Sequence, residues 1–184
     1  MIDAGPDMVH TAPMLRISEI NYSVEGRPLF EEASAVIAQA VAKGISLAVA
    51  ESLTGGAVAA DLVSIPGASA VFCGGIVAYD PVIKHDLLEV DAAALASGGA
   101  VTALVATQMA EGVAKRLSSD FAVATTGVAG PDPEPVSGQK PGTVFIAVAG
   151  TALGTLVREL ALTGDRAEIR AKATRAALQA LADG

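Results

Sequence analysis

The pattern of hydrophobic and polar residues predicts helices that alternate with short strands from about residue 29 onward. Residues 29–43 carry apolar side chains at helical spacing, and Gly44 follows at a position where a left-handed residue would end the helix. Residues 45–50 form a short apolar run that is typical of a buried strand. A turn rich in hydroxyl groups and glycine then leads into a second apolar helix, expected over residues 57–63.

The same alternation continues to the end of the sequence. Further strands are expected at residues 73–79, 121–125, 143–149 and 156–162, the last two as a hairpin. Further helices are expected after four residues that suit a helix N-terminus, namely Asp80, Asp91, Thr102 and Asp165. Alternating helices and strands predict an α/β fold with a mostly parallel sheet covered on both faces, and the hairpin would make the sheet mixed.

The first 28 residues differ in character from the rest. They are polar, contain proline and show only a weak apolar alternation around residues 15–20. We expect residues 1–28 to form an N-terminal extension, in part disordered, and residues 29–184 to form one globular domain. A length of 184 residues suits a single domain with a full core and is short for two ordinary ones.

Composition and charge narrow the classes of partner. The apolar runs fall short of the ~18 residues that a membrane span needs, and no secretory signal is visible at the start. A formal charge of −8 and an aromatic content of 3% argue against binding to a nucleic acid. The single cysteine, Cys73, excludes an internal disulfide and agrees with a reducing compartment. We therefore expect a cytoplasmic protein that binds neither membranes nor nucleic acids, although a helix N-terminus and one arginine could still hold a small anion.

The first candidate catalytic residues are three polar residues that flank one apolar strand. This strand is expected at residues 73–79. Ser69 precedes this strand, Tyr79 ends it, and Lys84 follows in the first turn of the next helix. A serine hydroxyl needs a neighbouring base, and a lysine can serve if burial and a helix N-terminus lower its pKa. Tyr79 could relay the proton or hold the lysine. The same three residues could equally be a turn residue, a strand-end aromatic and a solvated lysine.

Two further positions could hold an anion. Residues 51–56 join a strand to a helix through Ser52, Thr54 and two glycines, and a turn of this kind exposes first-turn amides to a ligand. Ser52 or Thr54 could instead only cap the helix. Arg166, beside Gly164 at the start of the last helix, could neutralise a phosphate or form a surface salt bridge.

Other sequence patterns do not support a known type of site. Residues 137–140 fit the S-x-x-K pattern, but they lie in a loop rich in proline and glycine and lack the companion K-T-G. Asp132 and Glu134 could be imagined as magnesium ligands, although two acids on such a loop are more often solvated. No Walker A motif, dinucleotide-binding G-x-G-x-x-G or zinc-ligand spacing occurs in the sequence.

Short motifs rich in glycine, serine and threonine occur at intervals from about Phe30 to the end of the chain. They are residues 50–56, 67–72, 75–79, 99–102, 126–131, 140–144 and 164–166. Their order and spacing resemble those of the CinA C-terminal domain family over more than four fifths of the chain. The resemblance implies a three-layer α/β/α domain that forms a homodimer or a higher homo-oligomer.

Members of that family are nicotinamide-nucleotide amidases. The resemblance therefore implies hydrolysis of nicotinamide mononucleotide to nicotinic acid mononucleotide and ammonia, with no metal or other cofactor. It implies Ser69 as the nucleophile, with Lys84 and Tyr79 activating it. The implied substrate-binding residues are Ser52, Gly67, Thr126, Gly127 and Arg166.

The sequence departs from the family pattern at several positions. Asp80 and Pro81 replace a frequent Ser-Asn pair before Lys84, and the extra carboxylate could raise the pKa of the lysine. Ala68 and Ala103 replace a frequent serine and a frequent glutamate. A nucleotide-binding or regulatory module that has lost catalysis is therefore the alternative function.

Overall fold

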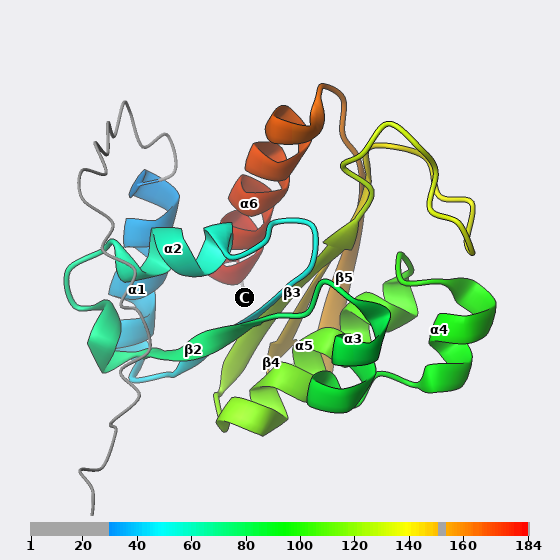
Figure 1. Ribbon diagram of the computed structural model, residues 1–184. Helices are drawn as coiled ribbons and strands as arrows, with labels where there is room; N and C mark the ends of the chain where they lie inside the picture. The colour runs from blue at the N-terminus through cyan, green and yellow to red at the C-terminus, as the bar shows by residue number, and fades with distance from the viewer. Residues whose placement is uncertain (1–29, 151–153, 184) are drawn as a thin grey trace, which may run out of the picture.

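The computed structural model describes residues 30–150 and 154–183, and the extension expected at residues 1–28 lies outside them. The described residues form α-helices, strands and one short 3₁₀ helix (Figure 1). The strands are β1 Leu47–Glu51, β2 Phe72–Val77, β3 Phe121–Gly127, β4 Thr143–Gly150 and β5 Gly154–Ala161. The helices are α1 Phe30–Lys43, α2 Ala57–Val63, the 3₁₀ helix η1 Ala68–Ala70, α3 Pro81–Leu88, α4 Ala92–Gly98, α5 Ala103–Leu117 and α6 Arg166–Ala182.

The strands form one sheet in the order β2-β1-β3-β4-β5. β1 pairs in parallel with both β2 and β3, whereas β4 pairs antiparallel with β3 and β5. The expected α/β class and the mixed sheet are confirmed, with parallel and antiparallel pairs equal in number. Ala50 of β1 lies opposite Ile76 of β2 and Ala124 of β3, so the ends of the three parallel strands lie nearly level.

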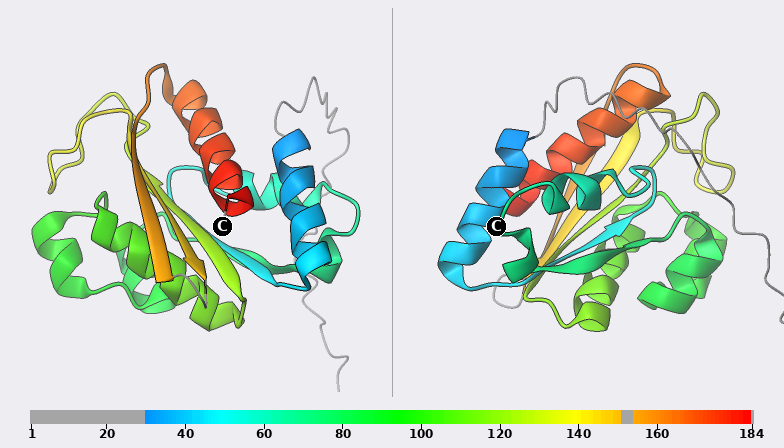
Figure 2. Two further views of the ribbon diagram at one scale, coloured as in Figure 1. Left: turned by 180° about the vertical axis from the view of Figure 1, so that it is seen from behind. Right: turned by 60° about the vertical axis from the view of Figure 1, so that its left-hand side comes forward.

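Helices cover both faces of the sheet and produce the three expected layers (Figures 1 and 2). α1, α2 and α6 pack on one face, and α3 and α5 pack on the other, where α4 adjoins α5. Each face has its own hydrophobic core. The sheet therefore separates the side chains of α6 from those of α3, except at the strand ends.

Strand β1, which lies between β2 and β3, places residues of different size on its two faces. Ala48 and Ala50 of β1 belong to the core beneath α5, whereas Val49 belongs to the core beneath α1 and α6. This alternation follows from the two-residue period of a strand, and small alanine side chains let α5 pack close to the sheet. Gly112 of α5 lies against the last turn of α3, where a Cβ atom would collide with the carbonyl oxygen of Leu88. The close contact fixes α3 relative to α5 and the sheet.

The carboxyl ends of the three parallel strands meet at one edge of the sheet. Ser52 follows β1, Tyr79 comes two residues after β2, and Gly127 ends β3. The connection after β1 crosses one face through α2, and the connection after β2 crosses the other face through α3, α4 and α5. Ligand sites in open α/β sheets form where successive connections diverge in this way.

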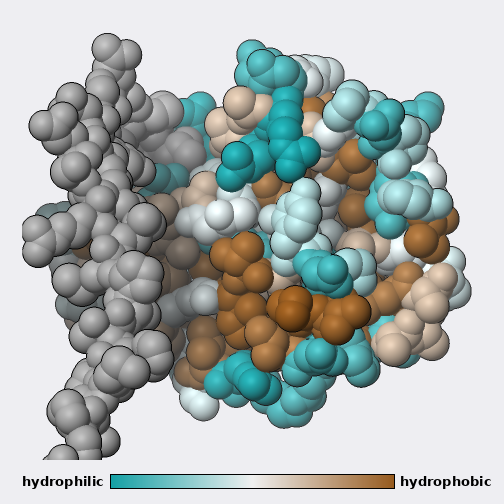
Figure 3. Space-filling model, viewed as in Figure 1, coloured by the Kyte–Doolittle hydropathy of each residue, from teal (hydrophilic) through white to brown (hydrophobic). Residues whose placement is uncertain are grey.

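Hydrophobic side chains form a band below the centre of one face of the molecule, over the region where β2 and α3 lie (Figure 3). Val77 of β2 and Val82 of α3 are exposed residues of these elements. β2 is an edge strand of the sheet, and an edge strand can pair with another chain. The homo-oligomer implied by the family resemblance remains a prediction. No helix within residues 30–150 and 154–183 is long and apolar enough to cross a membrane.

Candidate active site

A cavity of about 330 Å³ opens at the carboxyl ends of β1, β2 and β3. Its walls come from the turn after β1, the strand ends, the loop at residues 128–135 and the start of α6. Six of the expected site residues line it, namely Ser52, Tyr79, Lys84, Thr126, Gly127 and Arg166. The volume falls in the range of pockets that bind small molecules.

The start of α3 positions Lys84. The side chain of Asp80 accepts a hydrogen bond from the backbone N–H of Val82 at 2.8 Å, and Pro81 occupies the first helical position. Both features are those expected of a helix N-terminus. Lys84 therefore lies one turn into the helix, and its side chain is fully buried.

The amine of Lys84 is surrounded by three oxygen atoms. Its Nζ atom donates to Oγ of Ser52 at 3.0 Å and to the carbonyl oxygens of Ala78 at 2.5 Å and Tyr79 at 3.0 Å. Burial lowers the pKa of Lys84 from 10.5 to about 8, and the negative charge of Asp80 opposes the shift. A lysine with this pKa can accept and return a proton near neutral pH.

The turn after β1 positions Ser52. The backbone N–H of Ser52 donates to the carbonyl oxygen of Thr125 at 2.9 Å, which continues the pairing of β1 with β3. Only 8% of Ser52 is exposed to solvent, and the residue lines the cavity. The hydroxyl group that meets Lys84 is therefore held by the sheet itself.

A buried carboxylate holds the start of α2. Glu51 accepts hydrogen bonds from the backbone N–H groups of Gly56 at 2.9 Å, Val58 at 3.1 Å and Ala59 at 2.9 Å. Gly56 is the N-cap residue and no side chain caps the helix locally. The alternative in which Ser52 or Thr54 only caps α2 is therefore wrong, because Glu51 satisfies the first-turn amides instead. The hydroxyl of Ser52 is left available for chemistry.

Tyr79 contacts Lys84 through its backbone and not through its phenol. The carbonyl oxygen of Tyr79 accepts the hydrogen bond from Lys84, whereas the phenol oxygen accepts one from Nη2 of Arg166 at 3.2 Å. The side chain of Tyr79 is exposed at the cavity rim. The expectation that the phenol relays a proton to Lys84 is not supported by this geometry, since the phenol faces α6.

Ser69 and Gly67 do not line this cavity. Ser69 lies in η1, before the start of β2, and both residues line a separate open pocket with Phe72. The six residues of β2 separate Ser69 from the strand end near Tyr79, a span of about 20 Å at ~3.3 Å per residue. The expectation that Ser69 meets Lys84 is therefore wrong. The reason is the polarity of β2, which places residues before and after it at opposite edges of the sheet.

Thr126 and Gly127 form the β3 side of the cavity. The hydroxyl of Thr126 donates to the carbonyl oxygen of Ala100 at 2.7 Å and ties β3 to the segment before α5. A Cβ atom on Gly127 would lie 2.7 Å from the carbonyl oxygen of Thr143, so this position has no room for a side chain. Both residues shape the wall that a ligand would contact.

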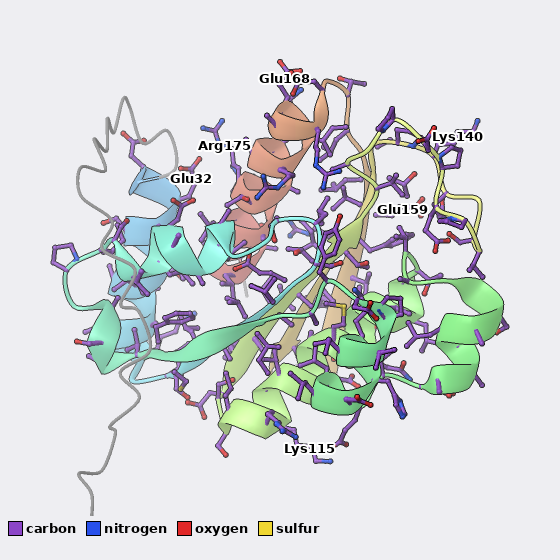
Figure 4. The ribbon with its side chains drawn as sticks, in the orientation of Figure 1. Glu32, Lys115, Lys140, Glu159, Glu168 and Arg175 are labelled. Carbon is purple, nitrogen blue, oxygen red and sulfur yellow. The ribbon has the colours of Figure 1, made fainter. Side chains whose placement is uncertain are left out.

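The start of α6 supplies a cation at the cavity rim. The side chain of Asp165 accepts a hydrogen bond from the N–H of Glu168, and the carboxylate of Glu168, labelled in Figure 4, accepts one from the N–H of Asp165. This capping box fixes the helix start at Arg166. A Cβ atom on Gly130 would lie 3.6 Å from Nη1 of Arg166, so the guanidinium adjoins the glycine loop.

The acidic loop after β3 also lines the cavity, through Asp132 and Glu134. Glu134 accepts hydrogen bonds from the N–H of Val136 at 3.0 Å and from the N–H and hydroxyl of Ser137. Partial burial would raise the pKa of Glu134, but these bonds and one from the backbone of Ala100 hold it below its usual value. Glu134 thus stabilises its own loop. No group of three or more metal-ligating side chains gathers within the part of the chain that the structure describes.

The family model for the CinA C-terminal domain matches residues 30–184. This chain belongs to the CinA C-terminal domain family. The recognition of the family from its motifs is thereby confirmed.

The relatives agree with this assignment. A CinA-like protein from Frankia casuarinae is 47% identical over 144 residues, which cover 78% of this chain and 32% of the relative. A CinA-like protein from Synechococcus sp. is 51% identical over 122 residues, which cover 64% of this chain and 28% of the relative. The chain therefore spans about a third of the length of these curated relatives.

Solved structures share the fold. The competence/damage inducible protein CihA from Agrobacterium tumefaciens matches with a TM-score of 0.81 and 35% identity, covering 87% of this chain and 97% of that one. The competence damage-inducible protein A from Klebsiella pneumoniae matches with a TM-score of 0.81 and 32% identity, covering 85% and 96%. Almost the whole of each solved chain thus corresponds to the domain described above.

Two charged residues of this CinA C-terminal domain escaped the sequence analysis. Glu51 ends a strand that is otherwise apolar, and a lone acid in a buried run is a signal that could have singled it out. Arg170 follows Arg166 by four residues on α6 and therefore lies on the same side of the helix. That spacing could have indicated a second arginine directed at the same region.

Proposed function

We propose that the protein is an amidase in which Ser52 attacks a carboxamide and Lys84 acts as the base. The observation that carries this proposal is the 3.0 Å separation between Nζ of Lys84 and Oγ of Ser52 beside the cavity. A nucleophile and its base must lie within hydrogen-bond reach of each other. Ser69, the nucleophile that the family resemblance implied, lies at the opposite edge of the sheet, so Ser52 takes that role in the proposal.

The surroundings of Lys84 support proton transfer from Ser52. A neutral amine has two N–H groups and one lone pair. The carbonyl oxygens of Ala78 and Tyr79 can accept both N–H groups, which leaves the lone pair for the hydroxyl proton of Ser52. Because burial disfavours the ammonium form, the neutral form is populated near the pKa of about 8.

The bond changes and proton transfers of the reaction involve only these two side chains, the substrate and water. Oγ of Ser52 forms a bond to the carboxamide carbon while its proton moves to Nζ of Lys84. Lys84 passes the proton to the amide nitrogen, the carbon–nitrogen bond breaks, and ammonia leaves an ester on Ser52. Water attacks that ester with Lys84 as base, the proton returns to Oγ of Ser52, and the free acid departs.

The substrate in this proposal is nicotinamide mononucleotide, as the family resemblance implies. The guanidinium of Arg166 at the rim, beside Gly130, can form charge-assisted hydrogen bonds with the phosphate. Holding the phosphate at the rim would place the carboxamide deeper in the cavity, near Ser52. Binding energy from the phosphate is then used to orient the reacting group.

The test incubates the purified protein with nicotinamide mononucleotide and measures ammonia and nicotinic acid mononucleotide. The expected result is equal amounts of both products from the wild type and background levels from Ser52→Ala. A wild type that releases no more ammonia than Ser52→Ala would reject the amidase. Calorimetry that detects nucleotide binding without ammonia release would then support the alternative, a binding module that has lost catalysis.

A further inference from the structure

Asp132 lines the cavity of the candidate active site, but the reaction described above does not use it. It lies in the loop between β3 and β4, drawn in yellow in Figure 1, within the run Pro131-Asp132-Pro133-Glu134-Pro135. The residue is exposed, and no hydrogen bond or ion pair holds its carboxylate within residues 30–150 and 154–183. The cavity wall therefore carries a negative charge that no described group neutralises by direct contact.

The neighbouring prolines explain why this carboxylate has no local partner. An aspartate side chain in a loop commonly accepts a hydrogen bond from the backbone N–H two residues further on. At that position the N–H of Glu134 donates instead to the carbonyl oxygen of Gln139 at 2.9 Å. Pro131 and Pro133, on either side of Asp132, have no N–H to donate. The nearest backbone positions thus leave the carboxylate free to meet a ligand.

The loop is held against the cavity. Proline fixes the backbone angle φ and restricts the residue before it to extended conformations, so the alternating prolines stiffen the backbone around Asp132. The carboxylate of Glu134 accepts hydrogen bonds from backbone N–H groups of its own loop and from the backbone of Ala100. Ala100 lines the same cavity from the segment before α5. These contacts keep Asp132 at the wall of the cavity.

The other charged groups of the cavity act on an anion in the opposite sense or more weakly. Lys84 has a pKa of about 8, so most of its population is in the ammonium form at pH 7. Arg166 adds a second positive charge at the rim. The charge of Glu134 is partly offset by the N–H groups that donate to it. A negative charge formed near Lys84 is therefore attracted by the amine and repelled by Asp132.

The proposed reaction forms such a charge. Nicotinamide mononucleotide and nicotinic acid mononucleotide share the phosphate, the ribose and the cationic ring, and they differ where a neutral carboxamide becomes a carboxylate. When both bind in the same orientation, the interactions of Asp132 with the shared groups are the same for both. The effect of Asp132 on the difference in affinity is therefore the repulsion of the new carboxylate.

The cavity is small enough for this repulsion to act across it. A sphere of about 330 Å³ is little wider than the Debye length of ~8 Å at physiological ionic strength. Two unit charges ~8 Å apart interact by an amount that corresponds to a factor of about 2 in binding at the dielectric constant of water and about 30 at that of a protein surface. Screening by salt removes part of this effect, so we expect a factor of about three to ten.

We propose that Asp132 is a specificity-determining residue that favours the amide substrate over the acid product, because its carboxylate repels the negative charge that hydrolysis creates. This inference rests on the amidase proposed above. It concerns the step after the chemistry, the departure of nicotinic acid mononucleotide. The ammonium group of Lys84 attracts the product, and Asp132 opposes that attraction.

The first test measures the dissociation constants of both nucleotides by calorimetry. Ser52→Ala serves as the background, so that the substrate is not consumed, and is compared with Ser52→Ala combined with Asp132→Asn. The affinity for nicotinic acid mononucleotide relative to nicotinamide mononucleotide should rise by about three- to tenfold when Asp132 loses its charge. If Asp132 instead binds the ribose that both ligands share, both affinities fall by the same factor. A ratio that changes less than about twofold would overturn the inference.

Two control variants separate the charge of Asp132 from other effects. Asp86 of α3 is also exposed but does not line the cavity, so Asp86→Asn should leave the ratio within about 1.5-fold of its original value. Asp132→Glu keeps the negative charge and should keep the ratio as well. A change in Asp86→Asn as large as that in Asp132→Asn would assign the effect to net charge and overturn the inference.

Salt and product inhibition provide a second measurement. Raising the ionic strength from about 0.01 M to about 1 M shortens the Debye length from about 30 Å to about 3 Å, so the effect of Asp132→Asn on the ratio should fall below about twofold at high salt. In the otherwise wild-type enzyme, Asp132→Asn should strengthen inhibition by nicotinic acid mononucleotide by about three- to tenfold. An effect that is equally large at both salt concentrations would contradict a role through charge.

The outcomes also distinguish this inference from the proposed function. A wild type that releases no ammonia, but whose binding ratio responds to Asp132→Asn, rejects the amidase and retains the discrimination by charge. An active wild type whose ratio does not respond rejects only the role of Asp132. If Asp132→Asn does not fold, Asp132→Ser removes the same charge and provides the same comparison.

Discussion

The Nζ atom of Lys84 lies 3.0 Å from the Oγ atom of Ser52, although 32 residues separate them in the sequence. Ser52 comes from the turn after β1, and Lys84 comes from the helix after β2. Because β1 and β2 are parallel neighbours, their carboxyl ends lie side by side and bring the two groups together. The pairing is therefore a consequence of strand order, and no local sequence motif contains both residues.

The two candidate serines should behave differently on substitution. Ser52→Ala should lower kcat for ammonia release from nicotinamide mononucleotide by at least about a thousandfold, because no other hydroxyl contacts Nζ of Lys84 among the described residues. Ser69→Ala should keep kcat within about threefold, because Ser69 lies in a separate pocket. Loss of activity in Ser69→Ala with retention in Ser52→Ala would contradict the assignment.

The pH dependence of kcat/KM should follow the ionisation of Lys84. Lys84 must be neutral to accept a proton, and a group with a pKa of about 8 becomes neutral as pH rises through that value. We therefore expect kcat/KM to be low at pH 6, to rise with a midpoint near 8 and then to level off. A pH-rate profile that is flat between pH 6 and 9 would exclude Lys84 as the base.

Asp80→Asn provides a matched test of that profile. Asn also caps helices, so the start of α3 should persist, but the negative charge that raises the pKa of Lys84 is removed. The midpoint of kcat/KM should therefore move to lower pH. Since about a tenth of a lysine population with a pKa of 8 is neutral at pH 7, activity at pH 7 should rise by up to about tenfold. A midpoint that moves upward would contradict this cause.

Much of the fold was predictable from the sequence because its signals are local. Residues that suit a helix N-terminus, such as Asp80 and Asp165, do begin α3 and α6, and the apolar runs do form strands within a few residues of the expected limits. The alternation of elements was enough to predict an α/β sheet with a hairpin at its end. The order of the strands in the sheet depends on contacts between segments that are distant in the sequence. The sequence pattern alone therefore did not reveal that β1 lies between β2 and β3.

The candidate site was less predictable than the fold for the same reason. Ser69, Tyr79 and Lys84 are close in sequence, but a strand carries Ser69 to the opposite edge of the sheet. Ser52 was expected to bind substrate, and only the parallel pairing of β1 with β2 places its hydroxyl against Lys84. Proximity along the chain was a poor guide here, because a strand separates its two ends by its whole length.

Tyr79→Phe should leave the reaction nearly intact. The phenol of Tyr79 contacts Arg166 and not Lys84, whereas the carbonyl oxygen that holds Lys84 belongs to the backbone and survives the substitution. We expect kcat within about threefold of the wild type and an unchanged pH midpoint, with at most a modest rise in KM for the nucleotide. Steady-state kinetics at pH 6, 7, 8 and 9 would test this. A loss of kcat by more than about a hundredfold would restore the phenol as a proton relay.

The buried amine should also leave a signature in protein stability. The pKa of Lys84 is about 8 in the folded protein and 10.5 without burial, so between these values the unfolded chain binds more protons than the folded one. The free energy of unfolding therefore rises with pH across that window, because burial penalises the charged form of the lysine only in the folded state. In Lys84→Met this dependence is absent. The free energy of unfolding of the wild type, measured by urea denaturation, should therefore gain about 2 kcal/mol relative to Lys84→Met between pH 7 and pH 9.5. A difference between the two proteins that stays constant over this range would mean that Lys84 is not desolvated as its burial indicates.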